Sequence, residues 1–216
     1  MVFDLGETLV DETRVWGEWA DALGIPRLTF FAVLGSTIAA GDQPHTAVFP
    51  IFRPDLDVRA ARRERLASGK EDWRFPDDLY PDVLDTLRAV RAAGYRIGIA
   101  GNQPDGADEA LHGAGIDVDL IGSSASWGVE KPDPAFFARI VHELKLPPER
   151  IAYVGDRVDN DIIPAADAGM VAIHLRRGPW AWIQVGRGTT PRAAATIDGL
   201  AELPQVLARA MSRLTR

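Results

Sequence analysis

Five short apolar runs along the chain have the composition of buried β-strands. Each run is bounded by glycine or polar residues and contains few polar positions, which is typical of strands covered on both faces in a parallel sheet. The runs occupy residues 1–5, 95–100, 120–122, 151–154 and 171–175. The pattern therefore predicts a parallel sheet built from these five segments.

Helical patterns, with an apolar residue at every third or fourth position, alternate with these runs. One of them begins with Asp133 as an N-cap, followed by a proline at the first helical position. The helices expected on this basis cover residues 83–93, 134–144, 161–168 and 200–211. Residues 178–191, rich in glycine and tryptophan, predict a loop. The alternation indicates an α/β fold, a Rossmann-like, doubly wound parallel sheet with helices on both faces.

Residues 12–78 interrupt the alternation, because they contain no strand-like run. Three helical patterns fill this stretch, at residues 15–23, 28–38 and 58–66. An independent helical domain of this size would be marginally stable, so we expect it to rest on the sheet domain as a lid. The predicted organisation is an α/β core formed by residues 1–11 and 79–216, with a helical cap inserted at 12–78.

Composition restricts the classes of function. The chain has 31 acidic and 24 basic residues and a net charge of −7, which argues against nucleic acid as the main partner. The absence of cysteine excludes disulfides, zinc–thiolate sites and thiol nucleophiles. No apolar run approaches the roughly 20 residues that cross a membrane, and we expect no signal peptide. We therefore expect a cytoplasmic protein that binds a small molecule or a metal ion, with neither a nucleic-acid nor a membrane partner; the sequence predicts no particular oligomeric state.

Acidic residues follow two of the predicted strands at their carboxyl ends. Asp4 lies at the end of the first strand, and Asp156, Asp159 and Asp161 follow the run 151–154. Since the carboxyl ends of parallel strands meet at one edge of the sheet, these carboxylates are expected to converge there. Carboxylates repel one another unless a hard cation neutralises them, and Mg2+ suits such a set of oxygen ligands.

A lysine is expected at the same edge. Only Lys70, Lys131 and Lys145 are lysines among the 24 basic residues, so the chain uses arginine for almost every general positive charge. Lys131 follows the predicted strand at 120–122, and its compact ammonium group would reach the carboxylates. We interpret Lys131 as a residue of the site rather than a surface lysine.

Four segments, in this order, resemble the motifs of the haloacid dehalogenase (HAD) superfamily. They are D-L-G-E-T at residues 4–8, A-G-N at 100–102, K-P-D-P at 131–134 and G-D-R-V-D-N-D at 155–161. The similarity extends over residues 1–173, and the helical insert lies where members with a type 1 cap carry theirs. The resemblance implies a hydrolase, most often a phosphatase that acts on a small phosphorylated metabolite.

The resemblance also implies a nucleophile and a metal site. Asp4 would attack phosphorus and form an aspartyl-phosphate, which water then hydrolyses, so that one difficult step is divided into two. Mg2+ would be held by the Asp4 carboxylate, the backbone carbonyl of Gly6 and the Asp156 carboxylate. Asp161 would hold a metal-bound water or support the other ligands.

Three further residues are implied to bind the phosphoryl group. Lys131 would offset the charge of the nucleophile and of the phosphoryl oxygens, where most catalysis of phosphoryl transfer originates. The Asn102 amide would position a substrate oxygen. Backbone N–H groups at Gly101 and Asn102 would bind phosphoryl oxygens.

The chain departs from the family pattern at two positions. Gly6 stands where the family has a second aspartate, which protonates the leaving group and then activates water, and losing such help typically slows a reaction about 10²- to 10⁴-fold. Gly101 stands where a serine or threonine hydroxyl binds the phosphoryl group. We expect weakened activity on poor leaving groups, whereas an acyl or aryl phosphate needs little protonation and would still react.

Two other functions remain open beside the phosphatase. The chain could be a catalytically degenerate HAD-fold protein that binds metal or phosphate or acts as an interaction module, because Gly6 and Gly101 replace reactive groups. It could also be a 2-haloacid dehalogenase, since those enzymes need neither the second aspartate nor a metal. Asp156 and Asp161 argue against the dehalogenase, because uncompensated carboxylates would repel a haloacid anion.

Overall fold

The computed structural model describes residues 1–41, 45–185 and 192–207. The chain divides into two compact units. The first, here called the core, consists of Met1–Asp11 and Leu79–Arg216. The second, here called the insert, is Glu12–Asp78.

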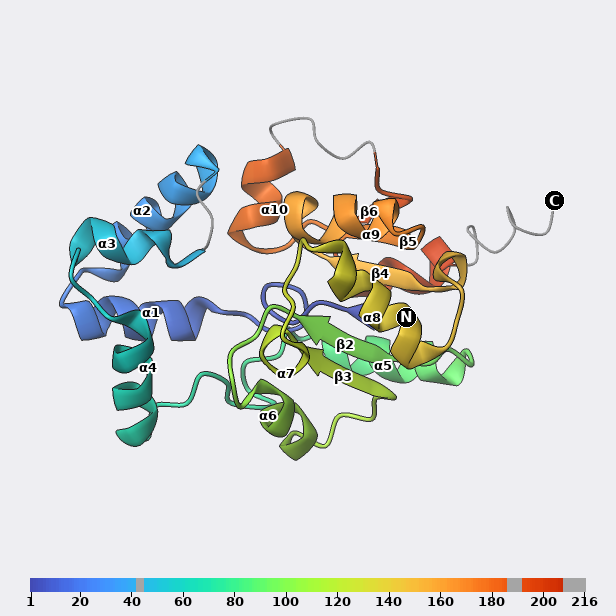
Figure 1. Ribbon diagram of the computed structural model, residues 1–216, viewed down its shortest axis with the longest axis horizontal. Coiled ribbons are helices and arrows are strands. Elements are labelled where there is room, and N and C mark those ends of the chain that lie inside the picture. Colours follow the sequence, from blue (N-terminus) through green and yellow to red (C-terminus); the bar gives the residue numbers. More distant parts are fainter. Residues whose placement is uncertain (42–44, 186–191, 208–216) are drawn as a thin grey trace. The chain divides into compact units, whose positions relative to one another are not determined.

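The described part of the core contains a six-stranded, wholly parallel sheet with the strand order β3-β2-β1-β4-β5-β6 (Figure 1). Its strands are β1 (Val2–Phe3), β2 (Gly98–Gly101), β3 (Leu120–Ser123), β4 (Ala152–Gly155), β5 (Val171–Leu175) and β6 (Ala195–Ile197). The predicted α/β class and parallel sheet are confirmed. Because β1 lies between β2 and β4, residues that follow these three strands meet at one edge of the sheet.

Helices and short helical turns connect the strands and flank the sheet (Figure 1). The helices are α5 (Val83–Ala92), α6 (Ala107–Gly113), α7 (Ser124–Trp127), α8 (Pro134–Leu144), α9 (Ile163–Asp167) and α10 (Gly178–Val185). A π-helical turn, Val158–Ile162, precedes α9, and 3-10 turns cover Pro148–Arg150 and Leu200–Glu202. Asp133 caps α8 as predicted, since its Oδ1 accepts a hydrogen bond from the Ala135 N–H at 2.8 Å.

Several elements of the core differ from the sequence-based expectation, among them α6 and α7, which were not predicted. Residues 178–185 form α10 instead of a loop, and 186–191 of the predicted loop lie outside the described residues. Strand β6 was not predicted, because it has three residues at the sheet edge and only Ile197 among them is buried. In the predicted terminal helix, 200–202 form a 3-10 turn and 203–207 are helical, and 208–211 lie outside the described residues.

The apolar side of α8 packs against the sheet. Phe136, Phe137 and Ile140 are fully buried in a cluster with Val2 of β1 and Tyr153 of β4. The Phe137 and Tyr153 rings meet edge-on with centroids 5.3 Å apart, a favourable aromatic geometry. This packing places the start of α8, and the loop before it, beside the ends of the central strands.

The insert has its own small aromatic core. Its helices are α1 (Thr13–Leu23), α2 (Arg27–Ala40), α3 (Val48–Phe52) and α4 (Val58–Ala67), with a 3-10 turn at His45–Ala47. Trp19 packs edge-on against Phe49 with centroids 4.8 Å apart, and Trp16 lies 6.2 Å from Phe30. Arg14 and Asp78, at opposite ends of the insert, form a two-pronged ion pair with N–O distances of 2.8 and 2.6 Å, which ties these ends together.

Among the helices that the structure describes, no single one is both long and apolar enough to cross a membrane. Of the described helices, α1 and α2 taken together reach the required length and apolar character, but the chain bends by 111° between them.

Candidate active site

Asp4 stands at the carboxyl end of the central strand β1. Its backbone N–H donates to the Val154 carbonyl at 2.9 Å, which continues the pairing of β1 with β4. The chain then turns tightly, because the Leu5 carbonyl accepts hydrogen bonds from the N–H groups of Leu9 and Val10 at 2.8 and 2.9 Å. Gly6 lies in this turn and bridges to Val10. The turn holds the Asp4 carboxylate almost completely out of solvent.

Lys131 forms ion pairs with two carboxylates of the site. Its Nζ lies 2.8 Å from Asp4 Oδ1 and 2.6 Å from Asp161 Oδ1, and the residue is only 3% exposed. Burial disfavours the ammonium ion, but the charges of Asp161 and Asp4 outweigh this and raise the pKa of Lys131 well above its ordinary value. Lys131 is therefore a fixed positive charge between the two carboxylates, as the sequence placed it.

The loop after β4 brings two more carboxylates to the same place. Asp156 and Asp161 are 1% and 0% exposed, and Asp161 Oδ2 accepts a hydrogen bond from the Arg157 N–H at 3.0 Å. Gly155 is required here, since a Cβ atom at that position would lie 2.4 Å from the Asp161 Cγ. Burial, followed by the charges of Asp161 and Asp4, raises the pKa of Asp156 well above its ordinary value, and burial raises the pKa of Asp161 to about 6.

This arrangement fits a hard divalent cation. One carboxylate oxygen each from Asp4, Asp156 and Asp161 lies within 4.8 Å of the others. Asp156 Oδ2 is buried and has no hydrogen-bond partner among the residues that the structure describes, which is costly unless a cation binds it. Three carboxylates face one ammonium group, so when ionised they leave an excess of negative charge. Mg2+ prefers such oxygen ligands, and the side chains of these three residues could hold it. The fourth predicted ligand, the backbone carbonyl of Gly6, lies in the turn directly after Asp4 and stays a prediction.

Asn102 contacts the site through Lys131. Its Oδ1 accepts from the Lys131 N–H at 2.7 Å, and its Nδ2 donates to the Lys131 carbonyl at 2.8 Å. Sequence reasoning assigned this amide to a substrate oxygen. In the structure both polar atoms bind the backbone of Lys131, so the side chain holds the loop that carries the ammonium group.

Gly101, the last residue of β2, lies directly beside the Asp4 side chain. A Cβ atom built on Gly101 would be 2.3 Å from Asp4 Oδ1, which is much closer than any non-bonded contact allows. The glycine therefore does more than remove a hydroxyl. It creates the space in which the Asp4 carboxylate meets Lys131.

We therefore expect Gly101→Ser to lower kcat/KM for any phosphate substrate by about 10²-fold or more, although it restores the usual hydroxyl. A displacement of about 1 Å at a reacting group is sufficient for such a loss. Steady-state kinetics with acetyl phosphate would measure it, and urea unfolding would show whether the variant is folded. Gly113→Ser is a matched control, because a Cβ atom at Gly113 meets nothing within 4 Å. A serine variant as active as the wild type would contradict the steric argument.

Several contacts around the turn were not predicted from the sequence. Glu7 has a φ of 52°, a left-handed conformation that side chains disfavour, and its Oε2 accepts a hydrogen bond from the Tyr80 hydroxyl at 2.7 Å. The Arg177 guanidinium stacks 4.1 Å above the Tyr80 ring and donates to the Thr8 carbonyl at 3.0 Å. In the loop after β4, the Asp156 carbonyl lies 3.0 Å from Nε2 of His174, a residue of β5. No periodicity or spacing signals these long-range contacts.

Known proteins resemble this chain both in sequence and in fold. Residues 1–169 match the family model described as haloacid dehalogenase-like hydrolase. Over 104 residues the chain is 38% identical to glyceraldehyde 3-phosphate phosphatase of Methanopyrus kandleri, a match that covers 47% of this chain and 45% of that protein. This chain therefore spans less than half the length of that relative.

Two matches that cover more of the chain are also to phosphatases. The chain is 31% identical over 173 residues to phosphoserine phosphatase of Thermus thermophilus, covering 74% of this chain and 68% of that protein. The crystal structure of a HAD phosphatase from Thermococcus onnurineus aligns with a TM-score of 0.61 and 23% identity, over 95% of this chain and 96% of the other. The structural match shows the fold, and the sequence matches are to proteins named as phosphatases.

Proposed function

Because this chain belongs to the haloacid dehalogenase-like hydrolase family, we propose that it is a Mg2+-dependent phosphatase that acts on a small phosphorylated metabolite through Asp4. The observation that carries the proposal is the convergence of three buried carboxylates with Lys131 at the carboxyl edge of the sheet. The phosphatase names of the sequence relatives support the same class of reaction.

In this proposal Asp4 is the nucleophile. Its carboxylate forms a bond to phosphorus while the bond from phosphorus to the leaving oxygen breaks, and water then attacks the aspartyl-phosphate to release phosphate and regenerate Asp4. Lys131 orients Asp4 through the 2.8 Å ion pair and offsets charge on the phosphoryl group. Asn102 holds Lys131 in place through two hydrogen bonds to its backbone. When bound by Asp4, Asp156 and Asp161, Mg2+ would supply further positive charge.

The leaving group is expected to depart without a proton from residue 6. Gly6 has no side chain to donate one, and the Glu7 carboxylate already accepts a hydrogen bond from Tyr80. The proposed substrates are therefore activated phosphates, such as acyl phosphates, whose leaving groups are stable as anions. Alkyl phosphates should react much more slowly.

A substrate screen with and without Mg2+ tests the proposed function. The wild type and Asp4→Asn are incubated with para-nitrophenyl phosphate, acetyl phosphate and 2-chloropropionate. We expect Mg2+-dependent phosphate release that is absent in Asp4→Asn, because an amide is a poor nucleophile. Circular dichroism would show that the variant is folded.

Other outcomes of this screen would replace the proposal. Chloride release from 2-chloropropionate without Mg2+ would indicate a dehalogenase. Silence on all three substrates, with Mg2+ still bound in calorimetry, would indicate a protein that has kept the metal site and lost the chemistry.

A further inference from the structure

The chain beyond the family match contacts both loops that carry the site carboxylates. The match ends at residue 169, whereas α10 begins at Gly178. We propose that Arg177, Gly178, Trp180 and Gln184, here called the brace, position these two loops, and that Gln184 is the decisive positioning residue. The proposal rests on the proposed function only where it concerns Mg2+ and turnover.

Gln184 holds the loop between Asp156 and Asp161. Its Oε1 accepts a hydrogen bond from the Val158 N–H at 2.7 Å, and its Nε2 donates to Asp159 Oδ1 at 2.7 Å. Val158 is the first residue of the π-helical turn, where an N–H group has no partner within the turn. Gln184 is 7% exposed, so it supplies this partner away from competing water.

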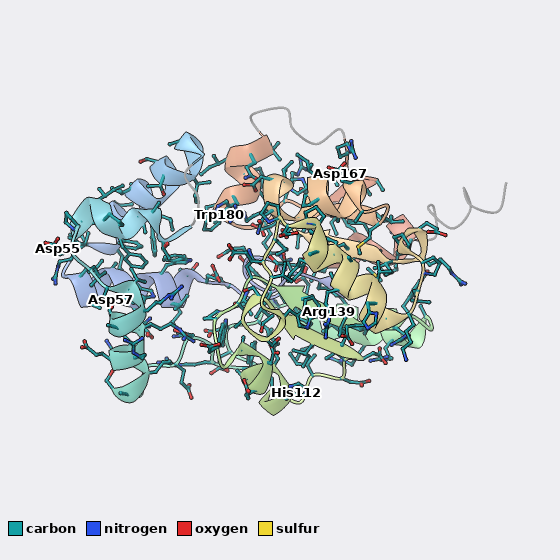
Figure 2. All side chains as sticks on the ribbon, in the orientation of Figure 1. Asp55, Asp57, His112, Arg139, Asp167 and Trp180 are labelled. Atoms are coloured by element: carbon teal, nitrogen blue, oxygen red, sulfur yellow. The ribbon has the colours of Figure 1, made fainter. Side chains whose placement is uncertain are left out.

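Trp180 contacts the same loop one residue after Asp156. Its ring lies 5.5 Å from the Arg157 guanidinium carbon, a cation–π distance, and Trp180 itself is buried on α10 (Figure 2). The Arg157 guanidinium also bonds Asp159 at 2.9 Å, and the Arg157 backbone N–H donates to Asp161 Oδ2. Trp180 therefore holds the residue whose backbone orients the Asp161 carboxylate.

The other end of the brace contacts the turn after Asp4. Arg177 Nη1 donates to the Thr8 carbonyl at 3.0 Å. Gly178 packs against Glu7 so closely that an added Cβ atom would lie 2.5 Å from Glu7 Oε2 and 2.6 Å from its Cβ. One short segment thus fixes the backbone on both sides of the carboxylate cluster.

The opposite side of α10 has no such role. Trp182 is 64% exposed, and its ring lies 5.9 Å from the Arg176 guanidinium carbon. A helix that served only to bury apolar area would be expected to place this tryptophan inward. Trp182 therefore offers a matched control on the same helix as Gln184.

The test compares Gln184→Ala with Trp182→Ala. In metal-free protein, hydrogen exchange of the amides at residues 156–162 should accelerate at least about 10-fold in Gln184→Ala, because the Val158 N–H loses its acceptor. The Mg2+ dissociation constant from calorimetry should rise about 10- to 100-fold, as is usual when a group that orients metal ligands is removed. Turnover should fall by a similar factor for every substrate. Trp182→Ala should match the wild type in all three measurements.

Two results would contradict the proposal that the brace positions the two loops. One is unchanged exchange and Mg2+ affinity in Gln184→Ala, and the other is an equal effect in Trp182→Ala. If Gln184→Ala does not fold, Gln184→Met keeps the side-chain volume without either hydrogen bond and is judged by the same measurements. Should the wild type neither bind Mg2+ nor hydrolyse phosphates, the proposed function fails. Faster exchange confined to residues 156–162 of the Gln184 variant would still support the brace.

Discussion

Gly6→Asp should raise kcat for alkyl phosphates by about 10²- to 10⁴-fold, which is the usual contribution of a positioned general acid and base. Residue 6 lies in the turn two positions after Asp4, where an aspartate could protonate the leaving oxygen and then activate water. Gly6 is not one of the described glycines with a positive φ, so its backbone conformation is compatible with a side chain. Acetyl phosphate should gain much less, because its leaving group needs no proton.

The comparison of the two substrates in steady-state kinetics is the measurement. Gly6→Asn is the control, since it has the size of aspartate but no proton to transfer, and it should produce no comparable gain. Equal gains on glycerol 3-phosphate and acetyl phosphate would refute the leaving-group argument. If Gly6→Asp gives no gain on glycerol 3-phosphate, residue 6 is not the position at which a general acid is missing.

Lys131→Met should lower the free energy of unfolding of the metal-free protein by about 3–5 kcal/mol, the usual effect of removing one partner from a buried ion pair. Asp4 and Asp161 would stay buried without the ammonium group that lies 2.8 and 2.6 Å from them. Urea unfolding in EDTA measures the loss, and kcat should fall along with it. Adding Mg2+ should restore part of the stability, because the cation offsets the same negative charge.

This loss should depend on pH. The pKa of Asp161 is raised by burial to about 6, so its carboxyl group is mostly protonated at pH 5 and ionised at pH 8. Because the folded pKa lies above the ordinary value of 3.8, the folded state loses stability as pH rises from about 4 to about 6. Lys131 lowers the pKa of Asp161, so its removal extends this loss to higher pH. The difference between variant and wild type should therefore be larger at pH 8. Lys70→Met, at an exposed lysine, should stay within about 0.5 kcal/mol at both values. Equal losses at pH 5 and pH 8 would contradict the ionic origin.

The sheet and the principal charged groups were accessible from the sequence. Strands β1 to β5 each overlap one of the predicted apolar runs, because strands buried on both faces must be apolar along their length. Their ends differ by up to three residues, and β2 begins at Gly98 instead of residue 95. Asp4, Asp156 and Asp161 follow such runs, and the carboxyl ends of parallel strands share an edge whatever the details of packing. Their convergence, with Lys131 between two of them, therefore depends mainly on the order of elements along the chain.

Helix α10 shows why some elements could not be predicted from the sequence. Its Gly-Pro-Trp start has the composition of a loop, and it presents a buried polar residue, Gln184, toward the core. Its polar atoms form hydrogen bonds with Val158 and Asp159, which lie 26 and 25 positions earlier in the chain. No local pattern distinguishes such a residue from an exposed glutamine.

By itself, the sequence determined the approximate strand segments, the class of fold, and the lysine and three of the four carboxylates expected at this edge, because apolar runs and strand ends are local properties. The fourth, Asp159, lies outside this cluster and pairs with Arg157 and Gln184 instead. The tertiary structure decided what their neighbours do. Asn102 turns its amide to Lys131, 29 residues away, and Gly101 leaves the space that the Asp4 carboxylate occupies. These assignments depend on distances between segments that only the folded chain brings together, and a hydrogen bond or a steric overlap is decided within a few tenths of an ångström.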